Sequence, residues 1–143
     1  MSAANYEKLF QDVPSKYALL RLLKPPVYEI ELSNNKLSAT CYYKDGSNKH
    51  HSLIADFSNR RMLVIDFDTA MQAVVALLCK FPKHFWFRSI AIINVSEELL
   101  DGLTPIETRM IIELIHVASS KARRHIICTE IRYHGEIITT ISS

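Results

Sequence analysis

The stretch that decides the fold reads Ser-Ile-Ala-Ile-Ile-Asn-Val at residues 89–95. A nearly unbroken apolar run of this kind is typical of a strand that is covered on both faces of its sheet. Thr-Pro-Ile-Glu follows at 104–107 and marks a helix start, with a capping hydroxyl and a proline at the first helical position. A second buried-type strand is predicted at 124–130. Strand, helix and strand in this order predict one parallel crossover unit.

The helix between these strands is expected to turn an apolar stripe toward the sheet. The stripe consists of apolar residues at helical spacing, namely Ile106, Met110, Leu114, Val117 and Ala118. Positive charge suits the end of a helix because it complements the helix dipole. A basic cluster lies at or just past this helix end, formed by Lys121, Arg123 and Arg124.

The preceding part of the chain predicts three antiparallel strands. They are expected at 27–32, 37–43 and 50–55, where alternating and β-branched residues favour extended structure. Residues 33–35 and 44–47 supply the turns, because asparagine and glycine tolerate a positive φ. These three strands form an antiparallel meander in the predicted fold.

A helix is predicted to join this meander to the crossover unit. Residues 61–67 either add a strand or lead directly into that helix, which runs from an Asp68 cap to about Lys80. At the end of the sequence, residues 131–141 predict a last strand or a hairpin.

Together these elements predict an α/β fold (α+β in its mixed sheet) of about five strands, with helices covering the sheet. The single α/β domain is assigned to residues 27–143. A helical lead-in is assigned to residues 1–26, where a short helix at 15–24 ends at two prolines.

Composition and charge narrow the classes of partner. The chain has 143 residues, a formal charge of +2 and 22% charged residues, which is an ordinary globular balance. A charge this small gives no support to a nucleic-acid partner. No apolar stretch approaches the ~20 residues that span a bilayer, and no secretory signal is visible at the N-terminus. We therefore expect a cytoplasmic protein without a membrane span.

The three cysteines, Cys41, Cys79 and Cys128, each lie in an apolar run, and none is near another. This spacing argues against a disulfide framework and against a zinc site. We expect buried free thiols that behave as small hydrophobes, and reduced thiols fit a cytosolic compartment. No metal and no cofactor is expected.

Three strands followed by alternating helix and strand is the ribonuclease-H-like order of the actin-like ATPases. Residues 63–67 resemble the segment of the bacterial actin-like MreB family that introduces its first long helix. Residues 90–95 and 103–109 resemble the core strand and helix start of that family, and 124–130 resemble the strand that ends in its double-glutamate turn. The resemblance implies a partial MreB-like, actin-like domain.

Two further runs, at 57–65 and 102–107, are more closely similar to the YjaA-like group of small enterobacterial proteins, which is linked to stress tolerance. The resemblance covers about residues 27–129. It implies an actin-like scaffold and a role in the stress response.

The loop that holds phosphate in the actin-like family differs in this sequence. The family's first strand ends in an Asp-Leu-Gly-Thr loop, where glycine lets the backbone approach the phosphate. Residues 31–36 read Glu-Leu-Ser-Asn-Asn-Lys, so the carboxylate is longer and the glycine is absent. The family's second phosphate loop and adenosine pocket have no room in this chain. We therefore expect a degenerate loop without nucleotide, formed by Glu31, Ser33, Asn34 and Asn35.

Two sets of carboxylates are candidates for chemistry. Glu107 matches the glutamate that positions the attacking water in the MreB family, which implies general-base work. Its alternative role is structural, as the fourth residue of a capping box that reaches back to the Thr104 amide. Glu31 and Asp66 form a second candidate, because paired carboxylates can hold Mg²⁺. The alternative for this pair is two solvated or capping acids.

The histidines give no metal or catalytic pattern. His50 and His51 are adjacent on a strand and so face opposite ways, which prevents them from binding one metal ion. His116 and His125 belong to apolar elements and are expected to be satisfied core or edge histidines. None has a cysteine or serine partner at a spacing typical of nucleophilic catalysis.

The segment at 81–88 is the most unusual in composition, since it combines four aromatic residues with basic ones. Two or three of the aromatic rings pack under the sheet in one interpretation. In the other, the segment is a docking loop for a protein, because aromatic residues and arginine are frequent anchors at interfaces. Stacking on nucleic-acid bases is a third, weaker interpretation. The candidate partner-binding residues are Phe85, Trp86, Phe87 and Arg88.

The sequence thus predicts a non-catalytic protein-binding or regulatory domain, a degenerate actin-like fold that does not bind nucleotide. We expect no enzymatic activity and a protein partner, and a homo-oligomer is compatible with the sequence. One alternative is a residual ATPase that uses Glu31 and Glu107. Another is a toxin-immunity or antagonist protein.

Overall fold

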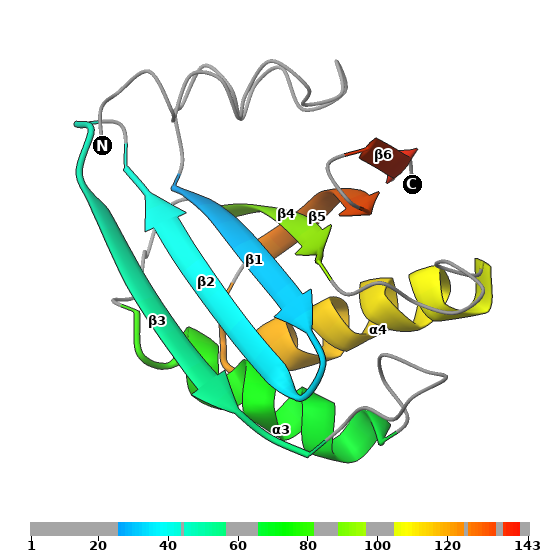
Figure 1. Ribbon diagram of the computed structural model, residues 1–143. Helices are drawn as coiled ribbons and strands as arrows, with labels where there is room; N and C mark the ends of the chain where they lie inside the picture. Colours follow the sequence, from blue (N-terminus) through cyan, green and yellow to red (C-terminus); the bar gives the residue numbers. More distant parts are fainter. Residues whose placement is uncertain are drawn as a thin grey trace.

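The computed structural model describes residues 26–43, 45–56, 66–81, 89–96, 105–124, 126–133 and 136–140. Within them the chain forms six strands and two helices, shown in Figure 1. In chain order these are β1 (Val27–Ser33), β2 (Lys36–Tyr42), β3 (Asn48–Ile54), α3 (Phe67–Leu78), β4 (Ser89–Val95), α4 (Pro105–Lys121), β5 (Ile126–Tyr133) and β6 (Glu136–Thr140). The predicted lead-in at 1–26 lies outside these residues except for Pro26, so the domain boundaries stay a prediction.

The strands form one mixed sheet in the order β3-β2-β1-β4-β5-β6. β1, β2 and β3 pair antiparallel, whereas β4 pairs parallel with both β1 and β5. This confirms the α/β class, the meander, the crossover unit and the ribonuclease-H-like strand order. The end of the chain forms a hairpin, in which β6 adds a sixth strand antiparallel to β5.

β1 lies in the middle of this sheet, and its residues alternate between two faces as predicted. Tyr28, Ile30 and Leu32 are buried in the main hydrophobic core. We call the face that carries them the helix face, because α3 and α4 both lie against it (Figure 1). The opposite face, which carries Glu29 and Glu31, is called the glutamate face. Period-two alternation therefore gives every β1 side chain a defined side.

The core on the helix face is built by both helices and four strands. α3 contributes Ala70, Ala73, Val74, Leu77 and Leu78 to it. β4 is buried on both faces, since Ile90 and Ile92 are as inaccessible as Ala91 and Ile93. This confirms the interpretation of the 89–95 run as a strand covered on both sides.

The phase of α4 differs from the prediction. The side chains of α4 that are buried toward the sheet start at Glu107 and continue with Ile111, Leu114, Ile115, Ala118 and Ser119. The predicted stripe began one residue earlier, at Ile106, which is 74% exposed. One residue is a rotation of about 100° on a helix. The prediction erred because several apolar residues of this helix also point sideways or outward.

The predicted burial of the cysteines is half right. Cys41 is buried in the core, whereas Cys79 is exposed at the C-terminal cap of α3. The helix ends at Leu78, before the apolar pattern does, and this places Cys79 outside the core. The side chain of Cys128 is not among those described.

α4 ends in a Schellman motif without glycine. The N–H of Arg124 donates to the Ser119 carbonyl at 2.8 Å, and the N–H of Arg123 donates to the Ser120 carbonyl at 3.1 Å. Arg123 takes a φ of 55° to close this motif. A left-handed backbone is unfavourable for a residue with a Cβ, so arginine is not the optimal residue at this position.

We expect the substitution Arg123→Gly to stabilise the protein. Glycine removes the steric cost of the left-handed conformation, which should raise the free energy of unfolding by about 1 kcal/mol. Urea denaturation followed by circular dichroism measures this change.

The matched control is Glu113→Gly, at an exposed position in the interior of the same helix. There glycine should lower the stability by about 1 kcal/mol, because the backbone is already right-handed. If both substitutions destabilise the protein, the Schellman end of α4 is contradicted.

Candidate functional site

The predicted degenerate loop, at Glu31, Ser33, Asn34 and Asn35, maps to one end of the sheet. The C-terminal ends of β1 and β4 lie on the same side of the molecule as the first turn of α4 (Figure 1). We call this end the carboxyl edge, defined by Glu31, residues 33–36 and the first turn of α4. Ligands of open α/β sheets bind at the carboxyl ends of the parallel strands, so this is where a site is expected.

The turn between β1 and β2 is the segment that the sequence resemblance matches to a phosphate loop. Pairing of the two strands continues to Ser33 and Lys36, which leaves only Asn34 and Asn35 between them. Asn35 takes a φ of 55°, as expected for asparagine in a turn, and its carbonyl accepts a bond from the Ala55 N–H at 3.1 Å. The turn is therefore short and is tied to the residue that follows β3.

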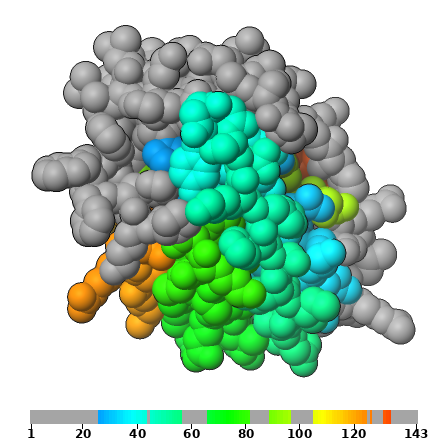
Figure 2. Space-filling view, turned by 90° about the vertical axis from the view of Figure 1, so that its left-hand side faces the viewer, coloured from blue at the N-terminus to red at the C-terminus, as the bar shows by residue number. Residues whose placement is uncertain are grey.

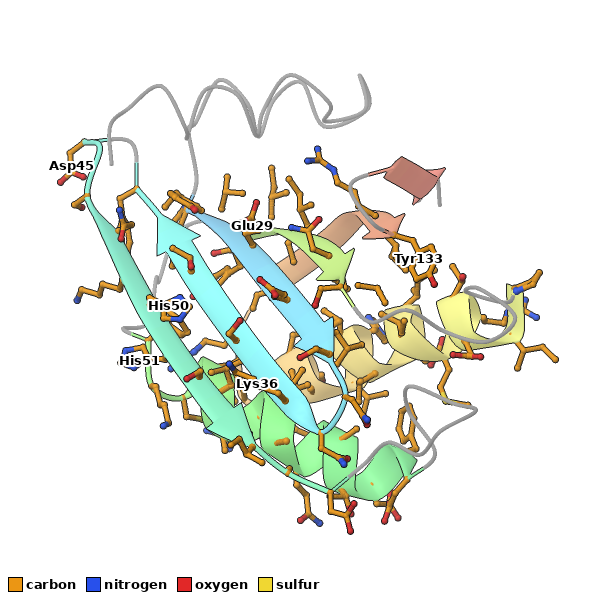
Figure 3. All side chains as sticks on the ribbon, viewed as in Figure 1. Glu29, Lys36, Asp45, His50, His51 and Tyr133 are labelled. Carbon is orange, nitrogen blue, oxygen red and sulfur yellow. The ribbon has the colours of Figure 1, made fainter. Side chains whose placement is uncertain are left out.

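The two candidate catalytic glutamates lie on opposite faces of the sheet. Glu31 is exposed on the glutamate face. Figure 3 labels Glu29, which lies two residues earlier on the same side of β1. Glu107 is 7% exposed and belongs to the side of α4 that packs on the helix face. The fold does not bring these two carboxylates together.

Glu107 is at the third position of α4, which begins at Pro105 as predicted. A carboxylate in the first turn of a helix is favoured by the helix dipole. Its proposed bond to Thr104 lies outside the described residues, so the capping box stays a prediction. Glu107 is buried on the same side of α4 as Ile111. The sequence analysis did not predict this, because it placed the buried stripe one residue earlier, at Ile106.

Asp66 is the N-cap of α3, where the sequence had placed Asp68. Its two carboxylate oxygens accept bonds from Thr69, one from the backbone N–H at 3.0 Å and one from the hydroxyl at 2.8 Å. The bond from the Thr69 N–H, followed by that from its hydroxyl, lowers the pKa of Asp66. Phe67 is helical, so Asp68 lies within the first turn. Of the two predicted roles for Asp66, the structure shows the capping one.

The histidines take separate roles. His50 and His51 point to opposite sides of β3, as predicted (Figure 3). The Nδ1 atom of His50 is 2.8 Å from the Thr40 hydroxyl, whereas the His51 ring contacts Phe81 edge-on at 4.8 Å. His116 is exposed on α4, which corrects its assignment as a core or edge histidine. His125 lies outside the described residues.

A metal centre finds no support in the part of the chain that the structure describes. No group of three or more histidine, cysteine, aspartate or glutamate side chains gathers there.

A buried polar cluster that the sequence did not reveal lies at the other end of the sheet. Tyr28, Cys41 and Tyr43 are neighbours there, and the Cys41 thiol is buried. Burial raises the pKa of this thiol to about 11, and the neighbouring Tyr43 and Tyr28 side chains offset only part of the effect. The thiol is therefore protonated at neutral pH and is a poor nucleophile. Strand alternation in β1 and β2 was the available signal, since it places Tyr28 and Cys41 on one face.

Arg124 joins this end of the sheet to α3. Its Nη2 atom donates to the carbonyl of Phe81 at 2.8 Å and to that of Leu78, the last residue of α3, at 3.3 Å. The sequence had assigned Arg124 to the dipole of α4, where its N–H does take part in the helix end. The side chain instead satisfies carbonyls at the C-terminal end of the other helix.

The aromatic segment is described only at its first residue. Phe81 is 2% exposed and contacts Tyr28 edge-on, with 5.3 Å between the ring centroids. This residue is part of the core. Phe85, Trp86, Phe87 and Arg88 lie outside the described residues, so their predicted role in binding a partner stays a prediction.

Comparison with known proteins shows similarity to solved structures but not to a known family. No family model and no curated protein matches the sequence. The ethanolamine utilization protein EutJ from Carboxydothermus hydrogenoformans is similar to this chain with a TM-score of 0.44 and 11% sequence identity. The match covers 83% of this chain and 52% of that one, so the chain spans about half the length of EutJ. Among the described helices, none has the length and apolar character needed to cross a bilayer.

We expect Asp66→Ala to remove the cap of α3 and to lower the melting temperature by roughly 3 °C at pH 7. The effect depends on pH because the pKa of Asp66 is lowered from 3.8 in the folded protein. Its stabilisation is complete above the unfolded-state value and is lost as the pH falls through the folded-state pKa. The difference between variant and parent, followed by circular dichroism, should therefore shrink below about pH 4.

Two control variants locate the cap. Asp66→Asn should keep most of the stability, since asparagine is also a good N-cap. Asp68→Ala should change the melting temperature by roughly 1 °C or less, because that side chain acts only through the dipole. A larger loss at position 68 than at 66 would place the cap where the sequence had it.

Proposed function

We propose that this protein is a non-catalytic protein-binding or regulatory domain, in which an actin-like scaffold serves without a bound nucleotide. The observation that carries this proposal is the short turn at Asn34 and Asn35, where the resemblance calls for a phosphate loop. A phosphate needs several backbone N–H groups directed at it, with no side chain in the way. Two asparagines between paired strands supply few such groups.

The separation of the two glutamates supports the same proposal. A magnesium nucleotide needs oxygen ligands that converge on one ion. Glu31 and Glu107 lie on opposite faces of the sheet, so they are poorly placed to share an ion or to act on one phosphate. Glu107 alone has a structural role available in the first turn of α4.

The proposal includes a cytoplasmic location and a role under stress. We place the protein in the cytoplasm, since the two cysteines seen in the described residues are free thiols. The YjaA-like resemblance extends the proposal to a regulatory role under stress. The partner is a protein, and the aromatic residues after Phe81 are the proposed contact.

Titration with magnesium ATP tests the loss of nucleotide binding. Isothermal calorimetry on the full chain should show no saturable heat up to about 1 mM nucleotide, which corresponds to a binding free energy weaker than about −4 kcal/mol. Binding in the micromolar range overturns the proposal and favours the residual ATPase.

A second variant separates specific from electrostatic binding. Lys36 is exposed beside the turn and is the nearest cation along the chain. If ATP binds weakly through charge attraction alone, Lys36→Ala should abolish that binding. ATP hydrolysis that is lost in Glu107→Gln, with an unchanged melting temperature, would contradict the non-catalytic assignment.

The docking prediction is tested at Trp86 and Phe87. Their joint replacement by alanine should weaken capture of a protein partner from the native cell while leaving the melting temperature within a few degrees. The matched control is Phe81→Ala, which opens a cavity in the core and should cost about 3–4 kcal/mol of stability. If the double variant loses as much stability as the control, these aromatics belong to the core and do not form a docking surface.

A further inference from the structure

The two edges of the sheet differ in how well they are protected from pairing. β6 is five residues long, and its pairing with β5 contains a register shift at Ile131 and Arg132. β3 is seven residues long and pairs with β2 without a shift. Bulges, short strands, prolines and charges are the means by which natural sheets block their edges. β3 has no proline, and Lys49 is its one formal charge with histidine neutral.

The β3 edge also lies at the molecular surface. Figure 2 faces this edge and shows β3 as a band across the front of the molecule, beside α3. Asn48, Lys49, His50, Ser52 and Ile54 are exposed. Ile54 is 80% exposed, which is unusual for a large apolar residue in a strand.

The hydrogen bonds at the two ends of β3 show which of its backbone groups point outward. The Tyr43 N–H donates to the Ser47 carbonyl at 3.0 Å, and the Ala55 N–H donates to the Asn35 carbonyl at 3.1 Å. Both pairs continue the register of β2 and β3. Hydrogen-bonded pairs alternate along an antiparallel ladder, so the odd-numbered residues of β3 bond to β2.

The even-numbered residues of β3 therefore direct their N–H and C=O groups away from the sheet. Among the described residues, no backbone group pairs with this side of the strand. The outward residues are Asn48, His50, Ser52 and Ile54. They form a row of donors and acceptors that is regular over the whole strand.

We propose that β3 pairs antiparallel with β3 of a second copy of this chain, across a two-fold axis at His51. This register matches all seven residues and makes every outward residue face another outward residue. His50 then faces Ser52 of the copy, and Asn48 faces Ile54. The two sheets join into one, with both pairs of helices on the same side.

Charge and side-chain chemistry favour a second copy of the chain as the partner of the β3 edge. In this register Lys49 faces Leu53 of the copy, so no two lysines are opposed. Leu53 is partly buried against the core, and the aliphatic part of a lysine side chain can cover its remaining surface. The outward row carries no formal charge that would select an acidic or basic peptide. The proposal does not depend on whether the protein binds nucleotide.

The interface is small, so we expect a reversible dimer. Pairing of single seven-residue strands buries less surface than the ~1,200 Å² of stable complexes, which implies association at micromolar or higher concentrations. Sedimentation equilibrium of the full chain up to roughly 200 µM should show a mass that rises from 16.4 kDa toward twice that value. A protein that stays monomeric over this range overturns the proposal, even if it binds an unrelated extended peptide.

A proline substitution tests the edge directly. The Ser52 N–H points outward, so Ser52→Pro should leave the hydrogen bonds to β2 intact and prevent pairing with β3 of the second copy. Each dimer loses a bond at both symmetry-related positions, which should raise the dissociation constant at least roughly tenfold. The control Leu53→Pro removes a bond to β2 and should lower the melting temperature instead. An unchanged dimer in Ser52→Pro overturns the proposal.

A cysteine at the axis tests the register. His51 faces its own counterpart in a non-hydrogen-bonded pair, where the Cα atoms are about 4.5 Å apart, a distance that a disulfide can span. In a Cys79→Ser background, His51→Cys should therefore form a covalent dimer with oxidised glutathione. His50→Cys should form far less, since its counterpart lies diagonally across. Cross-linking at position 50 that exceeds that at 51 contradicts the register.

Discussion

The rest of the structure depends on the pairing of β1 on both sides. β1 is antiparallel to β2 and parallel to β4, so it joins the meander to the crossover unit. Its backbone N–H and C=O groups are satisfied by two neighbours, which allows the strand to be buried. Tyr28, Ile30 and Leu32 can then enter the core on which α3 and α4 pack.

The same pairing fixes what the carboxyl edge can do. Because the side chains of β1 alternate, Ile30 and Leu32 in the core place Glu31 on the glutamate face. α4 packs on the helix face, and its buried stripe carries Glu107 to that side. Glu31 and Glu107, which the sequence offered as a catalytic pair, thus lie on opposite faces of the sheet. A one-residue shift in either element would be needed to reunite them, and it would expose core residues.

Polar groups inside the molecule serve the packing of the helices. Arg124 bonds to the carbonyls of Leu78 and Phe81, so a residue that follows α4 satisfies the end of α3. Burial also raises the pKa of the Cys41 thiol and keeps it protonated at neutral pH. These groups lie at the end of the sheet opposite the carboxyl edge, where their chemistry stabilises the fold. The two outer strands differ, since β6 carries an irregular pairing and β3 does not.

The sequence by itself determined the class of fold, the order of the strands and most of the element bounds. These follow from local periodicity, as in the apolar run of β4 and the turn at Asn35, where the residue type and the backbone conformation agree. It did not determine the phase of α4, the cap at Asp66 or the exposure of His116 and Cys79. Each of these depends on where a helix begins or ends and on how it is rotated against the sheet. Only tertiary packing decides that rotation, because a helix with apolar residues on several sides has no single local preference.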